Sequence, residues 1–286
     1  MVYVFGLLTA LSNAAAVTTQ HIASTSGEMK TSNWRLTLYL IRQPLWWFGW
    51  IAMAGSLVFQ SLALHFGPLS LVQPLLVSEL ILALALRALW LRQSIRLVTW
   101  FVAALTGLSL VAFLAFTGPS GGDHQPKTSS WLTPSLLCLF GVVTLVALAQ
   151  RGSPQRRAAM FASATAITWA IEATFIKSST DVIAALGPIG LLARWPVYAL
   201  IGAGVVGLFC EQAALHVGPL SVSQPIIVIV DPVVSVALGL WIYHERLRSG
   251  PWPLTFGATT FLAMCVGVVM LARLAPPTMS RDVHRL

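Results

Sequence analysis

Nine apolar runs, each close to 20 residues long, constrain the fold of this 286-residue chain more than any other feature. A helix needs about 20 residues to cross the hydrocarbon core of a bilayer. Only 9% of the residues are charged, whereas a soluble domain carries about 25%. The pattern therefore predicts an all-α polytopic membrane protein rather than a soluble helical domain. The expected spans are roughly 2–20, 44–64, 68–91, 97–117, 130–149, 157–177, 197–215, 219–243 and 255–273.

The charges between these spans are distributed unevenly. One set of segments sums to about +10 and contains Glu28, Lys30, Arg35, Arg42, Arg87, Arg92, Arg96, Arg151, Arg156, Arg157, Arg273, Arg281, Asp282 and Arg285. The opposite set is near +2 and contains little beyond Lys177, Asp181, Arg194, Glu245, Arg246 and Arg248. The positive-inside rule then places the N-terminus outside and the C-terminus in the cytoplasm of a cell (inner) membrane. The net charge of +8 is explained by this topology, so we expect membrane lipid and no nucleic acid as a partner.

Aromatic and cysteine residues fit the same reading. Eight tryptophans lie near expected span ends, where they form an interfacial belt: Trp46, Trp47, Trp90, Trp100, Trp131, Trp195, Trp241 and Trp252. Trp169 is the exception, in the middle of a span. The three cysteines fall inside apolar runs and predict no disulfide framework. The stretch 34–43 is either an interfacial helix or a solvated linker.

A segment of fifteen residues occurs twice in the chain, and we call it the repeated phrase. "ALHFGPLSLVQPLLV" (63–77) and "ALHVGPLSVSQPIIV" (214–228) agree at ten positions, 151 residues apart. Each copy joins two spans, and the five spans between the copies reverse the direction of the chain. The sequence therefore predicts an inverted repeat, spans one to four against six to nine, which underlies many secondary transporters. The expected parts are a first repeat (1–117), an outside loop with a connector span and a cytoplasmic loop (118–156), a second repeat (157–273) and a tail (274–286).

The repeated phrase contains residues that break helices. Gly67 and Gly218 permit tight turns. Pro74, Pro225 and the nearby Pro232 each leave a carbonyl without its helical partner. A free carbonyl must face protein, water or ligand inside a membrane. We expect Gln73 and Gln224, beside the first two kinks, to line a central site; shaping of helix packing is the alternative.

Four carboxylates interrupt the spans: Glu79, Glu172, Glu211 and Asp231. A charge at the centre of the membrane costs about 2.5–3.5 kcal/mol on insertion scales, which favours a functional position. Asp231 shares a helix face with Gln224 and Ser235, and together with the Val228 carbonyl these groups predict a polar track.

Several polar residues have simpler readings. Glu79 is either functional or a structural partner of Arg87. Glu172 lies one turn from both Trp169 and Lys177, and Glu211 can reach interfacial water. We expect Lys177 to extend to the interface as an end-residue, and His65 and His216 to cap turns.

The sequence contains no zinc-protease, P-loop, nucleotide-binding or serine-hydrolase pattern. It therefore predicts no enzyme, no catalytic residue and no cofactor. It leaves the question of a metal site open.

The segments "GPLSLVQPLLV" and "GPLSVSQPIIVIVDPVVSVALGLWIYHERL" resemble the drug/metabolite transporter superfamily, in particular its EamA-like and small actinobacterial members. Gly239 with "HERL" (244–247) resembles the "G…ExL" ending of that superfamily's repeats, whereas the first repeat reads "WLRQSI" at the matching place. The usual layout is ten spans, and nine spans with the N-terminus outside look like the NIPA-type magnesium transporters. The resemblance implies alternating access between two halves.

These observations predict a secondary transporter of a small organic metabolite or drug. Asp231 is the expected proton carrier, with Gln73, Gln224 and Trp169 lining the cavity. A NIPA-type magnesium permease is one alternative, with Asp231 and Glu79 as ligands. A non-transporting membrane partner or lipid-handling accessory is another. A homodimer is compatible with the sequence but not required by it.

Overall fold

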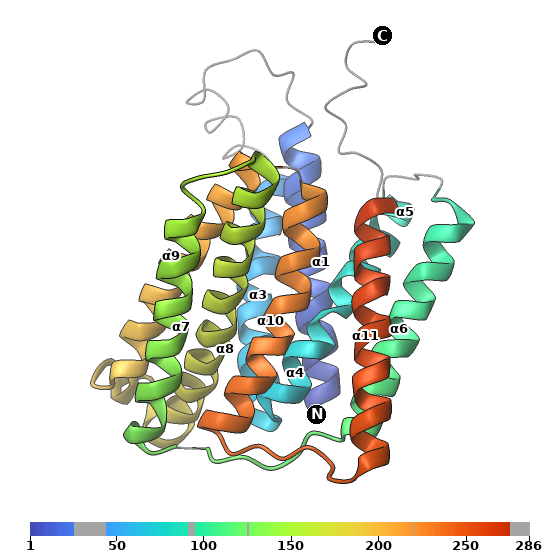
Figure 1. The fold of residues 1–286 in the computed structure, drawn as a ribbon. Helices are drawn as coiled ribbons and strands as arrows, with labels where there is room; N and C mark the ends of the chain where they lie inside the picture. The colour runs from blue at the N-terminus through green and yellow to red at the C-terminus, as the bar shows by residue number, and fades with distance from the viewer. Residues whose placement is uncertain (26–43, 91–94, 125, 219, 275–286) are drawn as a thin grey trace.

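A computed structural model describes residues 1–25, 44–90, 95–124, 126–218 and 220–274 of the protein. Its helices form one upright bundle (Figure 1). They are α1 (Val2–Thr25), α3 (Pro44–Phe66), α4 (Leu69–Leu76), α5 (Ser78–Trp90), α6 (Leu97–Thr117), α7 (Thr128–Leu148), α8 (Pro154–Leu192), α9 (Trp195–Val217), α10 (Leu220–Ile242) and α11 (Pro251–Leu274).

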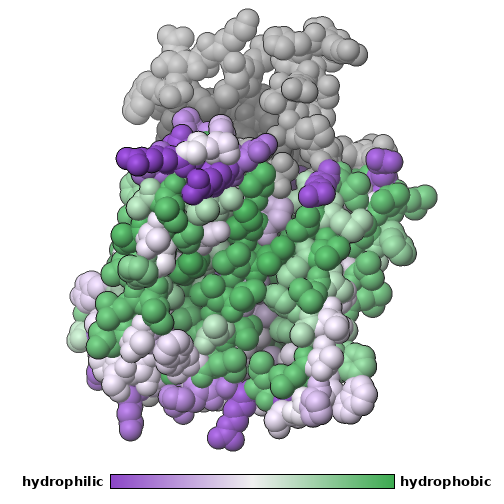
Figure 2. Space-filling view, viewed as in Figure 1, coloured by the Kyte–Doolittle hydropathy of each residue, from purple (hydrophilic) through white to green (hydrophobic). Residues whose placement is uncertain are grey.

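The fold class predicted from the sequence is confirmed. The described ranges hold nine helical stretches long and apolar enough to cross a membrane, the third made of α4 and α5 together. They hold no strand, only one isolated antiparallel bridge between Ser120 and Arg246. Figure 2 shows an apolar band across the middle of the face in view, with polar residues gathered above and below it. The protein is therefore an all-α polytopic membrane protein.

The two ends of the bundle differ in charge. The N-terminal end, at the bottom of Figure 1, carries Met1, the α3–α4 turn, residues 118–124 and the α10–α11 connection. The arginine end, opposite, carries Arg87, Arg96, Arg151, Arg156, Arg157 and Arg273. The first copy of the repeated phrase lies at the N-terminal end and the second copy at the arginine end. The interfacial stretch 34–43 and several of the loop and tail charges predicted to be cytoplasmic fall outside the described residues.

Helix pairing follows the same order in the two halves of the chain, 1–117 and 157–273. In the first half α1 packs along α3 and along α4 and α5; in the second half α8 packs along α9 and along α10. The halves meet where α6 packs against α11 and α4 against α10. The connector α7 packs on α8. The central elements α4, α8 and α10 are therefore held by neighbours from both halves.

The sixth span is longer than the sequence predicts. We expected it to end near residue 177, where a lysine ends the apolar run, but α8 continues to Leu192. Lys177 is buried rather than at an interface, because backbone carbonyls accept its hydrogen bonds. The chain bends only at Gly187, whose φ of 73° is a left-handed conformation that glycine adopts without steric cost.

The third span is broken, whereas its counterpart in the second half is continuous. α4 ends at Leu76 and α5 begins at Ser78, so the break falls at Val77, three residues after Pro74. Around the break, Val77 and Leu80 donate to the carbonyls of Pro74 and Val77, three residues back in each case. α10 runs through both Pro225 and Pro232 without interruption. The helix is therefore interrupted after the proline of the first copy but not after the corresponding proline of the second copy.

Trp131 is not part of an interfacial belt. Only 4% of it is exposed, because it stacks on Phe175 and meets Trp195 and Tyr243 edge to face. The expectation was wrong because Trp131 begins α7 at a point where α8 and the end of α10 cover it. Trp47, Trp90, Trp195, Trp241 and Trp252 are exposed, as the belt requires.

Candidate functional site

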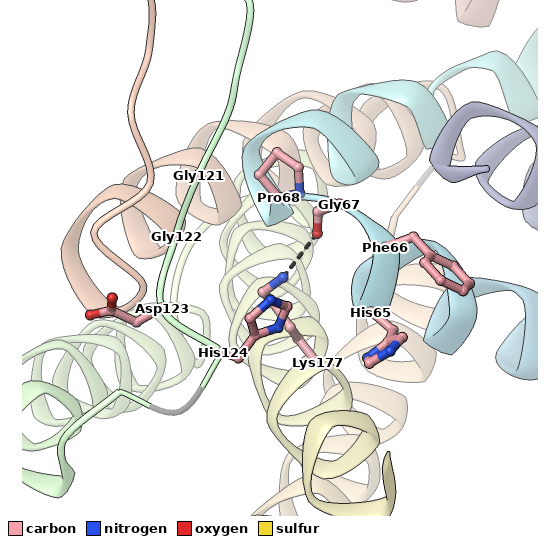
Figure 3. A pocket seen from close by; sticks show the side chains of 9 residues that line it. All are labelled: His65, Phe66, Gly67, Pro68, Gly121, Gly122, Asp123, His124 and Lys177. Carbon is pink, nitrogen blue, oxygen red and sulfur yellow. Dashed lines mark hydrogen bonds between the residues drawn. The ribbon is translucent and has the colours of Figure 1, made fainter. Parts of the chain in front are cut away.

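Two buried charged side chains of the second half form hydrogen bonds with the α3–α4 turn, residues 64–70. The first is Lys177 of α8, which is 5% exposed. Its Nζ donates to the Leu64 carbonyl at 2.8 Å and to the Gly67 carbonyl at 2.9 Å (Figure 3). These carbonyls end α3 and have no intrahelical partner. Lys177 therefore caps the C-terminus of α3, where the helix dipole favours a cation.

The second charge is Glu245, in the connection after α10. Its Oε1 accepts from the Leu69 amide at 2.6 Å, and its Oε2 accepts from the Ser70 amide at 2.9 Å and the Ser70 hydroxyl at 2.7 Å. These amides begin α4, where donors are unpaired and the dipole favours an anion. Glu245 therefore caps the helix that follows the turn. We call Lys177 and Glu245, with the carbonyls and amides they bind, the turn clamp.

Gly239 explains how Glu245 fits. A Cβ built on Gly239 would overlap the Glu245 carboxylate, and the Glu245 amide donates to the Gly239 carbonyl at 3.2 Å. His244 between them has a φ of 53°, which turns the chain back toward α4. The spacing of glycine and glutamate thus makes room for a carboxylate that reaches into the opposite half.

Asp181 lies one helical turn after Lys177 and continues the contact. Its Oδ1 is 2.8 Å from His65 Nδ1 at the end of α3. His124 Nδ1 is 3.5 Å from the other oxygen, too far for a strong hydrogen bond. His65 therefore pairs with a carboxylate of α8. The sequence had suggested instead that it caps its own turn.

Tyr243 fills the space beneath Lys177. Its ring centroid lies 5.3 Å from Lys177 Nζ, a cation–π distance, and its hydroxyl donates to the Thr174 carbonyl at 2.6 Å. Burial raises the pKa of the Tyr243 phenol well above its usual value, and the charges of Asp181 and Glu245 raise it further. The phenol therefore stays protonated and keeps its hydrogen bond.

Two connections lie together under the turn clamp. Ser120 and Arg246 exchange both backbone hydrogen bonds at 2.9 Å. The Asp123 amide donates to the Tyr243 carbonyl at 2.7 Å, and the Arg248 amide to the Thr117 carbonyl at 2.7 Å. Residues 117–123 are thus fixed to the α10–α11 connection at this end.

A cavity of about 200 Å³ opens beside these groups. It is lined by the turn residues 65–68, by the 121–124 stretch and by Lys177 (Figure 3). Lys177 forms its buried end, while the side chains of Asp123 and His124 are 59% and 72% exposed at its mouth. The cavity therefore connects the surface to the turn clamp.

The carboxylates inside the spans have different partners. In the second half, Ser235 donates to Asp231 Oδ1 at 3.0 Å, which brings these two members of the predicted polar track together. Glu172 lies over α9, because a Cβ at Gly204 would stand 3.3 Å from its Oε1.

In the first half, Glu79 does not pair with Arg87, so the predicted structural pair of these two residues is wrong. Asn13 of α1 donates to Glu79 Oε2 at 3.1 Å, so the carboxylate points at α1 instead. Arg87 Nε is buried without a hydrogen-bond partner.

The remaining predicted site residues are more scattered. Gln73 is 2% exposed, and its Nε2 has no hydrogen-bond partner. Gln224 is half-buried in α10. The Trp169 ring packs against α9 so closely that a Cβ at Gly207 would stand 2.8 Å from it, which places Trp169 at a helix interface. The structure thus joins Asp231 and Ser235 of the predicted polar track by a hydrogen bond, and places Glu172 and Trp169 against glycines of α9.

The two glycines of the repeated phrase are needed for close packing. Gly218 has an extended backbone, and a Cβ there would stand 2.9 Å from the Pro154 carbonyl at the start of α8. A Cβ at Gly67 would overlap the side chain of Val2. Neither backbone is left-handed, so close approach of neighbouring atoms, rather than a left-handed φ, is what favours glycine at these two turns.

Sequence reasoning missed the turn clamp. Glu245 was considered as a loop charge and as part of the "HERL" motif, Asp181 as a loop charge, and Lys177 as a loop charge and as the interfacial end of a span. One signal was present: a lysine and an aspartate four residues apart continue an apolar helical run, which implies that both share a buried face. Among the described residues, no three His, Cys, Asp or Glu side chains are arranged to hold a metal ion.

Comparison with known proteins gives one relative and no family. The chain is 26% identical to an uncharacterized protein of Corynebacterium glutamicum over 236 residues, which are 82% of each chain. No family model matches, and no solved structure matches. Fold and surface therefore define the class, an all-α polytopic membrane protein.

Proposed function

We propose that this protein is a secondary transporter that moves a small organic molecule by alternating access, coupled to protons. The observation that carries the proposal is the placing of carboxylates inside the spans beside neutral donors: Ser235 donates to Asp231 Oδ1 at 3.0 Å, and Asn13 donates to Glu79 Oε2 at 3.1 Å. Ionisable groups inside a membrane are costly and line substrate or proton pathways. A carboxylate held by a neutral hydroxyl or amide can take up and release a proton.

The pairing of helices supports two structurally related halves. α1 contacts α3 and α5 as α8 contacts α9 and α10, and the two copies of the repeated phrase lie at opposite ends. An inverted repeat of this kind places substrate where the halves meet, near discontinuous helices. The α4–α5 break and the unpaired amide of Gln73 supply such a place.

The turn clamp supports alternating access with the N-terminal end closed. Lys177 and Glu245 of the second half bind the α3–α4 turn of the first half, and His65 with Asp181 adds a third link. For substrate to pass at this end, these bonds must separate. With the N-terminus outside, as the charges favour, the clamp closes the external side.

Reconstitution tests the proposal. Proteoliposomes with an imposed proton gradient should show substrate-dependent proton movement in a metabolite screen. Asp231→Asn should lower gradient-driven flux at least tenfold yet leave exchange of substrate across the membrane, because a neutral amide cannot carry the proton. Thr255→Ala, on an exposed helix start, is the control. Unchanged driven flux in Asp231→Asn would contradict the proposed role of Asp231.

The same vesicles test the magnesium alternative. The nine-span count favours it, and Mg²⁺ needs only one or two carboxylates because it keeps most of its waters. Saturable Mg²⁺ uptake that Asp231→Asn and Glu79→Gln both abolish would replace the organic substrate with the ion.

A further inference from the structure

We propose that His65, Asp181 and His124 form a proton-binding latch, which holds the N-terminal end closed when the solution on that side is acidic. We call these three residues the His–Asp–His latch. The proposal deepens the proposed function by assigning a regulation to the end that the turn clamp closes. It rests on that function only where closure is identified with a step of transport.

Asp181 is a buried carboxylate with one oxygen unused. Its side chain is 3% exposed, and its Oδ1 lies 2.8 Å from His65 Nδ1. A carboxylate only accepts hydrogen bonds, so His65 carries a hydrogen on Nδ1 and donates it. Oδ2 is buried without a hydrogen-bond partner. Buried polar atoms are normally paired, so Asp181 has a place for one further donor.

His124 is positioned to supply that donor. Its Nδ1 lies 3.5 Å from Asp181 Oδ2, and its ring centroid lies 6.2 Å from that of His65. The His124 side chain is 72% exposed, so it can move and can exchange protons with the solution. A charge-assisted hydrogen bond needs about 2.7–2.9 Å, so an approach of about 0.7 Å would complete it.

Protonation makes this approach favourable. A neutral imidazole can leave Nδ1 without a hydrogen, whereas an imidazolium carries one on each nitrogen. The charge of an imidazole changes between pH 5 and 8. A proton taken from the solution by His124 therefore adds both a donor and a positive charge next to the unused oxygen of Asp181. At His65 a proton adds charge to a hydrogen bond that already exists.

The completed latch would join three parts of the chain. His65 ends α3 in the first half, and Asp181 belongs to α8 in the second half. His124 ends the 121–124 stretch, which lines the same cavity as His65 (Figure 3). That stretch is itself fixed to the α10–α11 connection, because the Asp123 amide donates to the Tyr243 carbonyl. Protonation thus adds a bond that ties this connection to α8 beside the turn clamp.

The charges around the latch favour a first proton and oppose a second. The neighbouring ionisable groups are Lys177 of α8, Asp123 of the 121–124 stretch, and Tyr243, His244, Glu245, Arg246 and Arg248 after α10. His244 pairs with Asp123 at 3.0 Å on an exposed surface, and Arg248 donates to the Ala115 carbonyl. Asp181 is the only carboxylate in contact with both imidazoles, within the part of the chain that the structure describes. Two imidazolium rings on this one carboxylate would repel each other, and Lys177 would add to the repulsion.

The latch gives alternating access a direction. A proton taken up from the side that the N-terminal end faces strengthens closure of that same end. Its release weakens the closure. Protons on one side of the membrane thereby shift the equilibrium between the closed and open forms of this end, through the differential contact that Asp181 makes with His124.

The test is thermal unfolding of the purified full chain in detergent at pH 5.5 and pH 8. The measured quantity is the acid gain, the Tm at pH 5.5 minus the Tm at pH 8. The stabilising contact is present when His124 is protonated and is lost at pH 8, so His124→Gln should lower the acid gain by about 2–4 °C. His65→Gln with His124→Gln should lower it further. His216→Gln, exposed at the arginine end, is the matched control and should keep the gain of the wild type.

Closure is measured separately by thiol labelling of Gln73→Cys from the His124 side, in a background without the three native cysteines. The rate is divided by that of the unfolded chain at each pH, which removes the pH dependence of the thiol itself. Acidification should slow labelling when His124 is present but not in His124→Gln. This readout distinguishes a latch from a histidine that only stabilises the fold.

Each outcome supports or overturns the latch. A smaller acid gain in His124→Gln, with the control unchanged, supports it. An acid gain that His124→Gln leaves at the wild-type value overturns it, as does an equal loss in His216→Gln or labelling that acid slows equally without His124. Unfolding and labelling are measured without transport, so a failed vesicle assay with an intact latch would remove the transport role alone. Driven flux with an acid gain that ignores His124 would remove the latch alone.

Discussion

The two copies of the repeated phrase agree at ten of fifteen positions, yet they are held in different ways. The turn at Gly67 is capped on both sides by buried charges of the other half, Lys177 and Glu245. The turn at Gly218 is packed against Pro154 and Ala158 of α8, in its own half. The helix after the first turn breaks at Val77, whereas the helix after the second runs on through two prolines.

The comparison shows that the local sequence determines the turn. Whether the following helix is broken depends on the groups that pack against it. Pro74 and Pro225 remove the same hydrogen bond in the same phrase. Only the copy whose start is fixed by groups from the opposite half is interrupted. The first copy is thus built as a joint between halves and the second as a joint within one half, and four measurements can break or sharpen this contrast.

The largest effect is expected from Glu245→Ala. It leaves two amides and a hydroxyl at the start of α4 buried without their acceptor. A buried donor left without its acceptor costs about 1–3 kcal/mol of unfolding free energy, and three donors are affected here. Denaturation in detergent micelles measures it, with Asp123→Asn as the exposed control. A loss below that of the control would mean that the cap does not stabilise the first turn.

Lys177→Met should cost less. The Leu64 and Gly67 carbonyls lose their donor, at about 1–3 kcal/mol for an unsatisfied buried group, but removal of a buried charge offsets part of it. We therefore expect the same denaturation experiment to rank Lys177→Met below Glu245→Ala. The reverse order would place the main support of the turn at α3 rather than α4.

The glycine pair compares the two turns directly. Gly218→Ala pushes a Cβ against the backbone carbonyl of Pro154, which cannot move easily, and should cost about 1–3 kcal/mol. Gly67→Ala meets the Val2 side chain near the chain start, which can shift, and should cost less. Thermal unfolding of the two variants measures the difference. Equal losses would show that both turns are equally confined.

The smallest effect is expected from Tyr243→Phe, at about 1 kcal/mol for one hydrogen bond to the Thr174 carbonyl. Because burial raises the pKa of this phenol, its contribution is fully present below the usual tyrosine pKa near 10 and is lost as pH rises above it. Unfolding curves between pH 8 and 11 should therefore show an alkaline loss that is smaller in the variant. Identical pH profiles would contradict a buried, protonated Tyr243.

The sequence predicted the spans because apolar length alone determines them, and most ends agree within a few residues. It failed at Lys177, where a charge inside an apolar run was read as a span end, and at Trp131, which was read as interfacial. Both errors have one cause: burial of a polar or aromatic side chain depends on partners distant in sequence. The Asp231–Ser235 contact was predictable from helical spacing, but Asn13 as the partner of Glu79 was not, since 66 residues separate them.

The most direct test of the account is labelling of Gln73→Cys in a background without Cys138, Cys210 and Cys265, using a membrane-impermeant thiol reagent on each side of intact vesicles. Gln73 is 2% exposed behind the turn clamp, and His124→Cys at the cavity mouth reports which side the N-terminal end faces. If the clamp closes this end, residue 73 should stay unlabelled from the His124 side and become labelled when Lys177→Met or Glu245→Gln is added. Labelling that these substitutions do not change, with His124→Cys still reactive, would contradict the clamp as the closed gate of a transporter.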